Sequence, residues 1–317
     1  MTYTPKQCRF GFFTDTHISR RRAFRTDDYY ASVLDKMRQC YEHFKEAGCE
    51  FVIHGGDMFD RYLSRSGQSL AATLEILLDV RDLIINSGLD TYYIWGQHDL
   101  MGYNRGTARG SSLNFLREIC EGHLKEVEDS VDLAGCKLFA CHVDQDPKIR
   151  LLDSPRGIFK PVVAVVHALL SPEREMFDTI DIASIGRVSP VLVLSGDLHK
   201  GFAPAVSNGT TYYNPGALAR TEKTDRKPKA AVITLEPLLG NWEIHIDEFF
   251  PTCEESPFPE EGEEVAEVDR EIDSDEYLKS FEKFRSESKD IYERLEKVGK
   301  EKNIEKGVID YITSKRG

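Results

Sequence analysis

The chain has 317 residues, of which 40% are hydrophobic and 30% are charged. This composition excludes a disordered chain and predicts a packed core, and no apolar run approaches the roughly eighteen residues of a membrane span. The first nine residues lack an apolar signal segment, and the seven cysteines are scattered with no C-x-x-C pair. We therefore expect a cytoplasmic protein whose thiols are reduced and mostly buried.

The net charge of −13 is unevenly distributed along the chain. Twelve acidic residues and one arginine lie between residues 254 and 276, whereas residues 277–317 have eleven Lys and Arg against eight acids. The remaining residues carry only a small negative balance. The total charge therefore neither supports nor excludes a nucleic-acid substrate.

Apolar runs and helical periodicities alternate along the first hundred residues, as in a β-α-β-α-β unit. Strands are expected at residues 8–14, 51–54 and 91–95, and helices at 29–47 and 70–85. A third helix is expected at 112–120. Further strands are expected at 136–141, 162–166, 191–195 and 210–213, with a closing hairpin formed by 230–235 and 242–246.

The strand at residues 51–54 stops at the pair Gly55-Gly56, and Asp57 follows at once. Open α/β sheets bind ligands at the carboxyl ends of their strands, so Asp57 is a candidate ligand. Other strands also end in Asp, His or Gln, which gives seven candidates in all: Asp15, His17, Asp57, Gln97, His167, Asp197 and His199. Two divalent ions that share one bridging carboxylate require such a mixed oxygen and nitrogen set.

Three features leave alternatives open. His142 ends a strand as His167 does, so the two compete as ligands. His54 is interpreted as a core histidine or as a residue that supports a ligand. The basic loop around Arg20 and Arg25 is either solvated or in contact with a phosphate group.

In chain order, these motifs resemble the five motifs of the calcineurin-like metallophosphoesterases. The resemblance covers roughly residues 9–217 and rests on these segments: Asp15-x-His17, Gly56-Asp57-x-x-Asp60-Arg61, Gly96-Gln97-His98-Asp99, His167 and Gly196-Asp197-x-His199. It implies an α/β fold in which two packed mixed β-sheets are flanked by helices, in α/β/β/α layers. Residues 1–252 would form this catalytic domain. The residues around Tyr213-Asn214-Pro215-Gly216-Ala217 make the chain most similar to the SbcD/Mre-eleven DNA repair nucleases.

The resemblance implies a role for each matching residue. One metal would be held by Asp15, His17, Asp57 and His199, and the other by Asp57, Gln97, His167 and Asp197. His167 is favoured over His142 because its spacing to Asp197 fits the family. A hydroxide between the ions would attack phosphorus. His98 would protonate the leaving oxygen, Asp60 would orient His98, and Arg61 would contact a phosphate oxygen.

The chain departs from the family pattern at two ligands and in its size. Gln97 stands where the family usually has Asn, and Asp197 stands where it usually has His. Both changes favour the harder ions, so we expect Mn²⁺, with Mg²⁺ as the alternative. Only about 100 residues follow His199, so the DNA-capping domain of larger relatives is reduced or missing.

The end of the chain is predicted to be an acidic linker at residues 253–273 and a helical hairpin at 274–317. Its apolar residues form a heptad stripe, namely Tyr277, Phe281, Phe284, Ile291, Leu295 and Val298. This stripe either packs on the protein's own domain or binds a partner. The resemblance implies a coiled-coil ATPase similar to SbcC as that partner. A homodimer is a further expectation, and no membrane partner is expected.

Three functions compete. The leading hypothesis is a Mn²⁺-dependent DNA nuclease, acting as an exonuclease or an endonuclease in DNA repair or recombination. The second is a phosphodiesterase or phosphatase for small molecules or nucleotides. The third is a scaffold with a degraded metal site, which the presence of both Asp57 and His98 makes the weakest.

Overall fold

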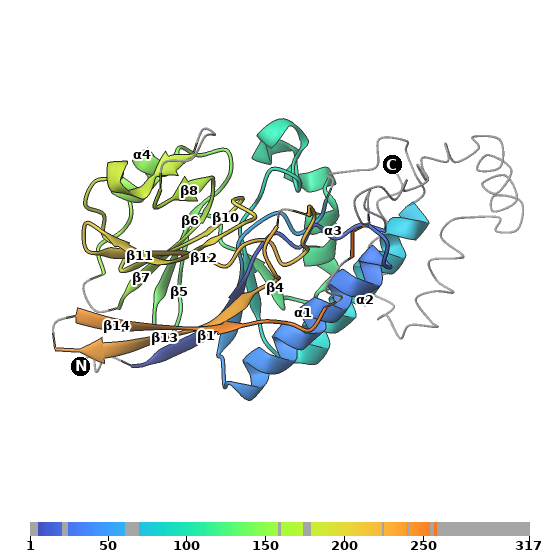
Figure 1. Ribbon diagram of the computed structural model, residues 1–317, viewed down its shortest axis with the longest axis horizontal. Helices are drawn as coiled ribbons and strands as arrows, with labels where there is room; N and C mark the ends of the chain where they lie inside the picture. Colours follow the sequence, from blue (N-terminus) through green and yellow to red (C-terminus); the bar gives the residue numbers. More distant parts are fainter. Residues whose placement is uncertain are drawn as a thin grey trace, which may run out of the picture. The chain divides into compact units, whose positions relative to one another are not determined.

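The computed structural model describes residues 6–20, 25–60, 70–157, 160–173, 179–223, 225–239, 241–253 and 257–258. Within these residues, two six-stranded mixed sheets pack face to face. Figure 1 shows the long helices α1 and α2 beside one sheet and the short helix α4 beyond the other. This α/β/β/α arrangement confirms the predicted fold class.

The first sheet has the strand order β14-β13-β1-β2-β3-β4. Its strands are β1 (Cys8–Phe13), β2 (Phe51–His54), β3 (Thr91–Tyr93), β4 (Leu124–Glu126), β13 (Ala230–Leu238) and β14 (Asn241–Phe249). Strands β1 to β4 are parallel, and the β13–β14 hairpin is added antiparallel to β1. The carboxyl ends of β1, β2 and β3 therefore lie at the same edge.

The second sheet has the order β11-β12-β10-β7-β6-β5. Its strands are β5 (Ser130–Asp132), β6 (Lys137–Cys141), β7 (Val162–His167), β10 (Leu192–Gly196), β11 (Phe202–Ser207) and β12 (Thr210–Asn214). The four central strands are parallel, and every residue of β7 and β10 is buried. Continuous apolar runs such as β7 are typical of central parallel strands that are covered on both faces.

The helices are α1 (Tyr29–Glu46), α2 (Leu70–Ser87), α3 (Ser112–Ile119) and α4 (Pro147–Leu152). Short 3-10 turns are η1 (Met101–Tyr103), η2 (Arg105–Gly110) and η3 (Ile182–Ser184), and β8 (Leu170–Ser171) pairs with β9 (Ile180–Asp181). Helix α1 begins after Asp28, whose side chain accepts a hydrogen bond from the Ala31 amide. A capping carboxylate satisfies one of the amides that a helix start leaves unpaired.

The main core fills the space between the two sheets. Alternate residues of β1 point into it and meet alternate residues of β7 and β10, for example Phe10 and Phe12 on one side and Val163 and Leu194 on the other. Helix α1 packs on the opposite face of β1. A Cβ atom at Gly11 would lie 2.3 Å from the Phe44 ring, so only glycine permits this close approach.

The longer predicted elements are confirmed to within a few residues. Six elements were not predicted: β4, β5, β8, β9, β11 and α4. Five of them are short or lie exposed at a sheet edge, so they lack a clear hydrophobic period. Helix α4 did carry a signal, because Asp146 caps it and Pro147 occupies its first turn.

The predicted helical hairpin at 274–317 and nearly all of the predicted linker lie outside the described residues. The segment before them is described in part. Pro257 accepts a hydrogen bond from the Thr26 amide at 2.9 Å, and the Phe258 side chain is 7% exposed. These two residues therefore pack on the domain that the preceding strands form.

Two features bear on the environment of the chain. Among the described helices, none has the length and apolar content needed to cross a bilayer. All seven cysteines lie in described segments as free thiols, and six of them are buried. The prediction of reduced, mostly buried cysteines is confirmed.

Candidate metal centre and active site

The carboxyl ends of strands from both sheets meet at one place, and the predicted ligands lie there. Strands β1, β2 and β3 lead to Asp15, His17, Asp57, Gln97 and His98, and strands β7 and β10 lead to His167, Asp197 and His199. Main-chain hydrogen bonds join these ends, since the Asp15 amide donates to the Gly56 carbonyl at 3.1 Å. The pattern that the sequence showed as separate strand ends is a single cluster in space.

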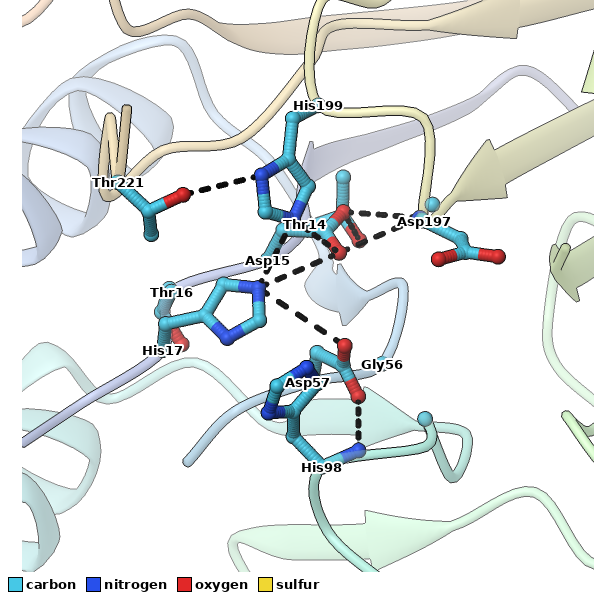
Figure 2. A network of polar contacts seen from close by, with 12 residues as sticks. Thr14, Asp15, Thr16, His17, Gly56, Asp57, His98, Asp197, His199 and Thr221 are labelled. Carbon is cyan, nitrogen blue, oxygen red and sulfur yellow. Dashed lines mark hydrogen bonds and ion pairs between the residues drawn. The ribbon is translucent and has the colours of Figure 1, made fainter. Parts of the chain in front are cut away.

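Four of the predicted ligands have a left-handed backbone conformation. Their φ angles are 53° at Asp15, 40° at His17, 52° at Asp57 and 72° at Asp197. A residue other than glycine costs on the order of 1–3 kcal/mol when held in a sparsely populated conformation, and such residues cluster at functional sites. Strain at these four positions therefore marks the loops that carry them as a functional site, although the Asp197 carboxylate points away from the other three side chains (Figure 2).

Two glycines permit the close packing of this cluster. A Cβ atom at Gly56, where φ is +103°, would lie 2.3 Å from Nδ1 of His167. A Cβ atom at Gly96 would lie 2.1 Å from Oδ1 of Asp57. Both positions therefore require glycine, because the ligand side chains occupy the space that any other residue would need.

Asp15, His17 and His199 form the first group of candidate ligands. Nε2 of His17 and Nε2 of His199 lie 3.0 Å apart, and each lies 3.8 Å from Oδ1 of Asp15. Figure 2 shows the three side chains pointing toward one another, with the Asp57 carboxylate also facing Nε2 of His17. Ligand atoms that share an ion about 2.1 Å away lie roughly 3–4 Å apart, so this spacing suits a cation.

Asp15, Asp57 and His167 form the second group, and all three are buried. Oδ2 of Asp57 lies 3.4 Å from Nε2 of His167 and 3.8 Å from Nε2 of His17. Asp57 therefore faces both groups, which is the position that a bridging carboxylate requires. Its bridging role remains a prediction.

Several buried polar atoms at this place have no hydrogen-bond partner among the described residues. They include Oδ2 of Asp57, Oε1 of Gln97 and Nε2 of His167. The amide nitrogen of Gln97 donates to Oδ1 of Asp197 at 2.6 Å, which holds the Gln97 side chain in place. A buried polar atom without a partner is costly, and cation coordination would remove that cost. The residues therefore fit a metal centre.

Two of the three candidate histidine ligands, His167 and His199, have a partner at their other nitrogen, whereas Nδ1 of His17 has no hydrogen-bond partner among the described residues. Nδ1 of His167 donates to the Gly55 carbonyl at 2.8 Å. Nδ1 of His199 donates to Oγ1 of Thr221 at 3.1 Å, and Thr221 in turn donates to Asp225 at 3.1 Å. These contacts occupy Nδ1 and leave Nε2 as the nitrogen that would bind an ion, as metal-bound histidines require.

The structure separates the three histidines that sequence reasoning left open. His142 accepts at Nδ1 from the Trp95 amide at 3.1 Å and donates from Nε2 to the Glu128 carbonyl at 3.0 Å, so neither nitrogen is free. Burial, together with Arg105, lowers the pKa of His142 to about 4. His54 is buried and contacts Thr16 and the Gly56 amide. Both act as structural histidines, and His167 alone joins the group.

His98 lies at the partly exposed edge of the centre. Its ring is 4.8 Å from that of His17, and its amide donates to Oδ1 of Asp57 at 2.8 Å. Nδ1 of His98 donates to the main-chain carbonyl of Asp60 at 2.7 Å, while the Asp60 carboxylate lies 3.6 Å from Nδ1 of His17. Asp60 is thus placed to orient His98 through its main-chain carbonyl.

Two basic residues that were singled out in the sequence do not add to this geometry. Arg61, predicted to contact phosphate, lies outside the described residues. Arg25 donates to Asp27 at 2.7 Å and its side chain is only 2% exposed. Arg25 is therefore neither solvated nor available to a substrate phosphate, whereas the Arg20 side chain is 49% exposed and pairs with Glu75, so the two interpretations of the loop stay open for Arg20.

The carboxylates and histidines strongly perturb one another. Burial alone would raise the pKa of Asp57, but His167, His17 and His98 hold it well below its usual range. Burial opposes charge on His167 too, yet Asp57 raises its pKa well above the usual value. Asp225 and Asp15 raise the pKa of His199 to about 9 despite its burial. The same negative potential would stabilise bound cations.

Sequence reasoning missed residues that hold the ligands. Oδ1 of Asp99 accepts from the Phe59 amide at 3.0 Å, and Oδ2 accepts from the Met58 and Gly96 amides at 3.3 Å. Asp99 thus joins the loops that carry Asp57 and His98, and its place in a quoted motif was a usable signal. Thr221 and Asp225 had no such signal, because they lie more than 20 residues after the ligand that they support.

A family model described as calcineurin-like phosphoesterase matches residues 8–200. The chain belongs to this family. Calcineurin-like phosphoesterases are metal-dependent hydrolases that bind two divalent ions, and the two ligand groups described above are the candidate sites for them. Membership in the narrower SbcD/Mre-eleven branch does not follow from this match. A comparison with curated proteins finds no match.

The solved structures to which this chain is similar are distant in sequence. A dimetal phosphatase from Danio rerio is 11% identical with a TM-score of 0.48, and the alignment covers 78% of this chain and 99% of that one. An archaeal phosphodiesterase is 15% identical with a TM-score of 0.38, covering 75% and 99%. A putative 5'-nucleotidase from Staphylococcus aureus is 11% identical with a TM-score of 0.47, covering 81% and 56%. These similarities do not bear on the substrate.

Proposed function

We propose that this calcineurin-like phosphoesterase is a two-metal phosphodiesterase that cleaves DNA, as an SbcD/Mre-eleven-like nuclease of the cytoplasm. The observation that carries the phosphodiesterase proposal is the position of Asp57 between two ligand groups, with His98 at the partly exposed edge. The order of the motifs and the segment Tyr213-Asn214-Pro215-Gly216-Ala217 support the choice of DNA.

The residues of the chain divide the work between binding ions and moving a proton. The Nε2 atoms of His17, His167 and His199 and the carboxylates of Asp15, Asp57 and Asp197 would hold the ions, together with Oε1 of Gln97. Bound Mn²⁺ or Mg²⁺ would stabilise negative charge on phosphoryl oxygens and supply a nucleophilic water. We propose Mn²⁺ because oxygen ligands predominate over nitrogen ligands in this set.

His98 is placed to protonate the leaving oxygen. Its Nδ1 hydrogen is engaged by the Asp60 carbonyl at 2.7 Å, which fixes the ring and directs the other nitrogen away from that loop. When the ring is protonated, the Nε2 hydrogen is therefore the one that it can transfer. Diester cleavage benefits from such an acid because the leaving alkoxide is strongly basic.

A second candidate function, hydrolysis of small phosphoesters or nucleotides, uses the same residues. The net charge of −13 favours it, because DNA-binding proteins usually present a basic surface to the phosphate backbone. A non-catalytic scaffold is less consistent with the structure, since the orphaned ligand atoms and His98 are all in place.

The deciding experiment is a Mn²⁺-dependent cleavage assay on linear duplex DNA, single-stranded DNA, bis-p-nitrophenyl phosphate and a mononucleotide. We expect cleavage of DNA and of bis-p-nitrophenyl phosphate, with His98→Ala as the inactive control. Rapid hydrolysis of the mononucleotide with no cleavage of either DNA would overturn the nuclease proposal and establish the second candidate. Product lengths over time would distinguish an exonuclease from an endonuclease.

We also propose that the tail at residues 274–317 binds an SbcC-like coiled-coil ATPase. The heptad stripe needs a surface to bury against, and its helices would dock as an amphipathic helix does in a groove. In the full chain, Phe281→Glu with Ile291→Glu should abolish association with that ATPase and leave Mn²⁺ binding unchanged. Loss of folding in this variant would show that the stripe packs on its own chain. Sedimentation of the wild type would test the expected homodimer.

A further inference from the structure

Phe258, at the end of the described chain, makes cation–π contacts with two arginines. The guanidinium carbon of Arg25 lies 5.3 Å from the centre of its ring, and that of Arg220 lies 5.5 Å away. The Phe258 side chain is only 7% exposed, and the neighbouring Pro257 carbonyl is bonded to Thr26. Cation–π contacts strengthen when they are desolvated, so these two contacts hold the segment in place.

Arg220 is connected to His199 through its neighbour in the chain. Arg220 is followed directly by Thr221, whose Oγ1 accepts the Nδ1 hydrogen of His199 at 3.1 Å. Arg220 itself has a left-handed backbone with φ of 52°, so its conformation depends on its surroundings. The Arg220 carbonyl accepts from Arg25 at 2.7 Å, which ties this loop to the second arginine.

Arg25 is connected to His17 through Tyr29. The guanidinium of Arg25 also lies 5.2 Å from the ring centre of Tyr29, on the first turn of α1. The hydroxyl of Tyr29 donates to the main-chain carbonyl of His17 at 2.9 Å. The two routes from Phe258 therefore end at two side chains of the same ligand group, whose Nε2 atoms are 3.0 Å apart.

We propose that Phe258 is a positioning residue for the Asp15–His17–His199 group, and that it acts through Arg220 and Arg25. The proposal rests on the metal centre inferred above. It assigns the end of the catalytic domain a role in one ion site and none in the other, because His167 is held by the Gly55 carbonyl and not by this segment.

The test uses the full-length protein, stripped with EDTA and titrated with Mn²⁺ while free Mn²⁺ is followed by electron paramagnetic resonance. The wild type should bind two ions. In Phe258→Ala, one ion should bind with wild-type affinity and the other about 10–100-fold more weakly, which is the usual effect of losing a residue that supports a ligand. Phe258→Trp should have the wild-type affinity, because its larger aromatic ring preserves the cation–π contacts with Arg25 and Arg220. Phe250→Ala, at a 55% exposed position in the same segment, is the matched control and should have no effect.

A second readout does not depend on bound metal. In EDTA, at a pH above the His199 pKa of about 9 so that the ring is neutral, side-chain ¹⁵N spectra should show His199 as the Nδ1-protonated tautomer in the wild type and as a mixture in Phe258→Ala. Unchanged spectra with two wild-type affinities in Phe258→Ala would overturn the proposal. If the wild type itself bound fewer than two ions, the metal centre would be wrong, and the tautomer alone would decide the coupling. If melting in EDTA shows that Phe258→Ala does not fold, Arg220→Gln replaces it with the same expected outcomes.

Discussion

The two groups of candidate ligands are supported in different ways. On the His167 side, the supports are main-chain atoms of neighbouring loops: the Gly55 carbonyl holds His167, and the His98 amide holds Asp57. On the His199 side, the two histidines are supported by side chains from distant parts of the chain, Thr221 for His199 and Tyr29 for His17, while Asp15 accepts from the Asp197 amide. The first side is also fully buried, whereas the His199 side chain is 25% exposed.

This difference indicates on which side a support can be removed by mutation without loss of the ion on the other side. Main-chain supports persist as long as the loops fold, so the His167 side should respond only to changes in its own ligands and glycines. Side-chain supports can be removed one at a time. The His199 side should therefore be the adjustable half of the centre, which the following predictions test.

The largest effect should come from Asp57→Ala, because Asp57 faces both sides. The variant should lose both ions and all measurable hydrolysis of bis-p-nitrophenyl phosphate. Elemental analysis after dialysis against a low Mn²⁺ concentration measures the loss. Two bound ions per chain in this variant would show that the two sides do not share Asp57.

His98→Ala should retain both ions and lose roughly 10²–10⁴-fold in rate, the usual contribution of a proton donor. His98 contacts Asp57 through its main-chain amide, which the substitution keeps, and its ring is not a ligand in this assignment. Metal content and kcat are measured on the same sample. If metal is lost along with activity, His98 belongs to the ligand set.

Thr221→Val should lower the affinity for one ion about 10–100-fold and leave the affinity for the other unchanged. The substitution removes the hydroxyl oxygen that accepts the Nδ1 hydrogen of His199. Isothermal titration with Mn²⁺ separates the two affinities. Thr252→Val, at an exposed position far along the chain, is the control of identical chemistry. Equal weakening of both ions would mean that the two sides are not independently supported.

The smallest effect on metal binding should come from His142→Ala. The change leaves the buried Trp95 amide and Glu128 carbonyl without their hydrogen-bond partner. The free energy of unfolding, measured by urea denaturation, should therefore fall by roughly 1–3 kcal/mol. Both ions should still bind. His167→Ala is the matched variant on the next strand, and it should lose the ion of the buried side.

His142 and His167 show that a histidine at the end of a strand cannot be assigned as a ligand from the local sequence alone. Both follow buried apolar strands of the same sheet, and from the residues alone they were equivalent. What separates them is where each ring nitrogen finds a partner, and those partners, Gly55 for one and Trp95 and Glu128 for the other, are non-local. The family resemblance selected His167 correctly as the residue beside Asp57.

By itself, the sequence determined the order of the main strands and helices and the identity of the clustered side chains. These properties follow from local information, namely hydrophobic period and short motifs at strand ends, which parallel pairing then brings to one edge. Asp15, Asp57 and His199 could therefore be assigned to one site without coordinates.

Only the tertiary structure decided how the site is held. The supports of His199 begin 22 residues after it, and Phe258, at the end of the described chain, packs against Arg220 in the same loop. Such contacts have no period or spacing in the sequence, because they arise from the packing of segments that the fold brings together. The left-handed backbone at four ligands was equally invisible, since strain at Asp15 or Asp57 is imposed by neighbours and not by residue type.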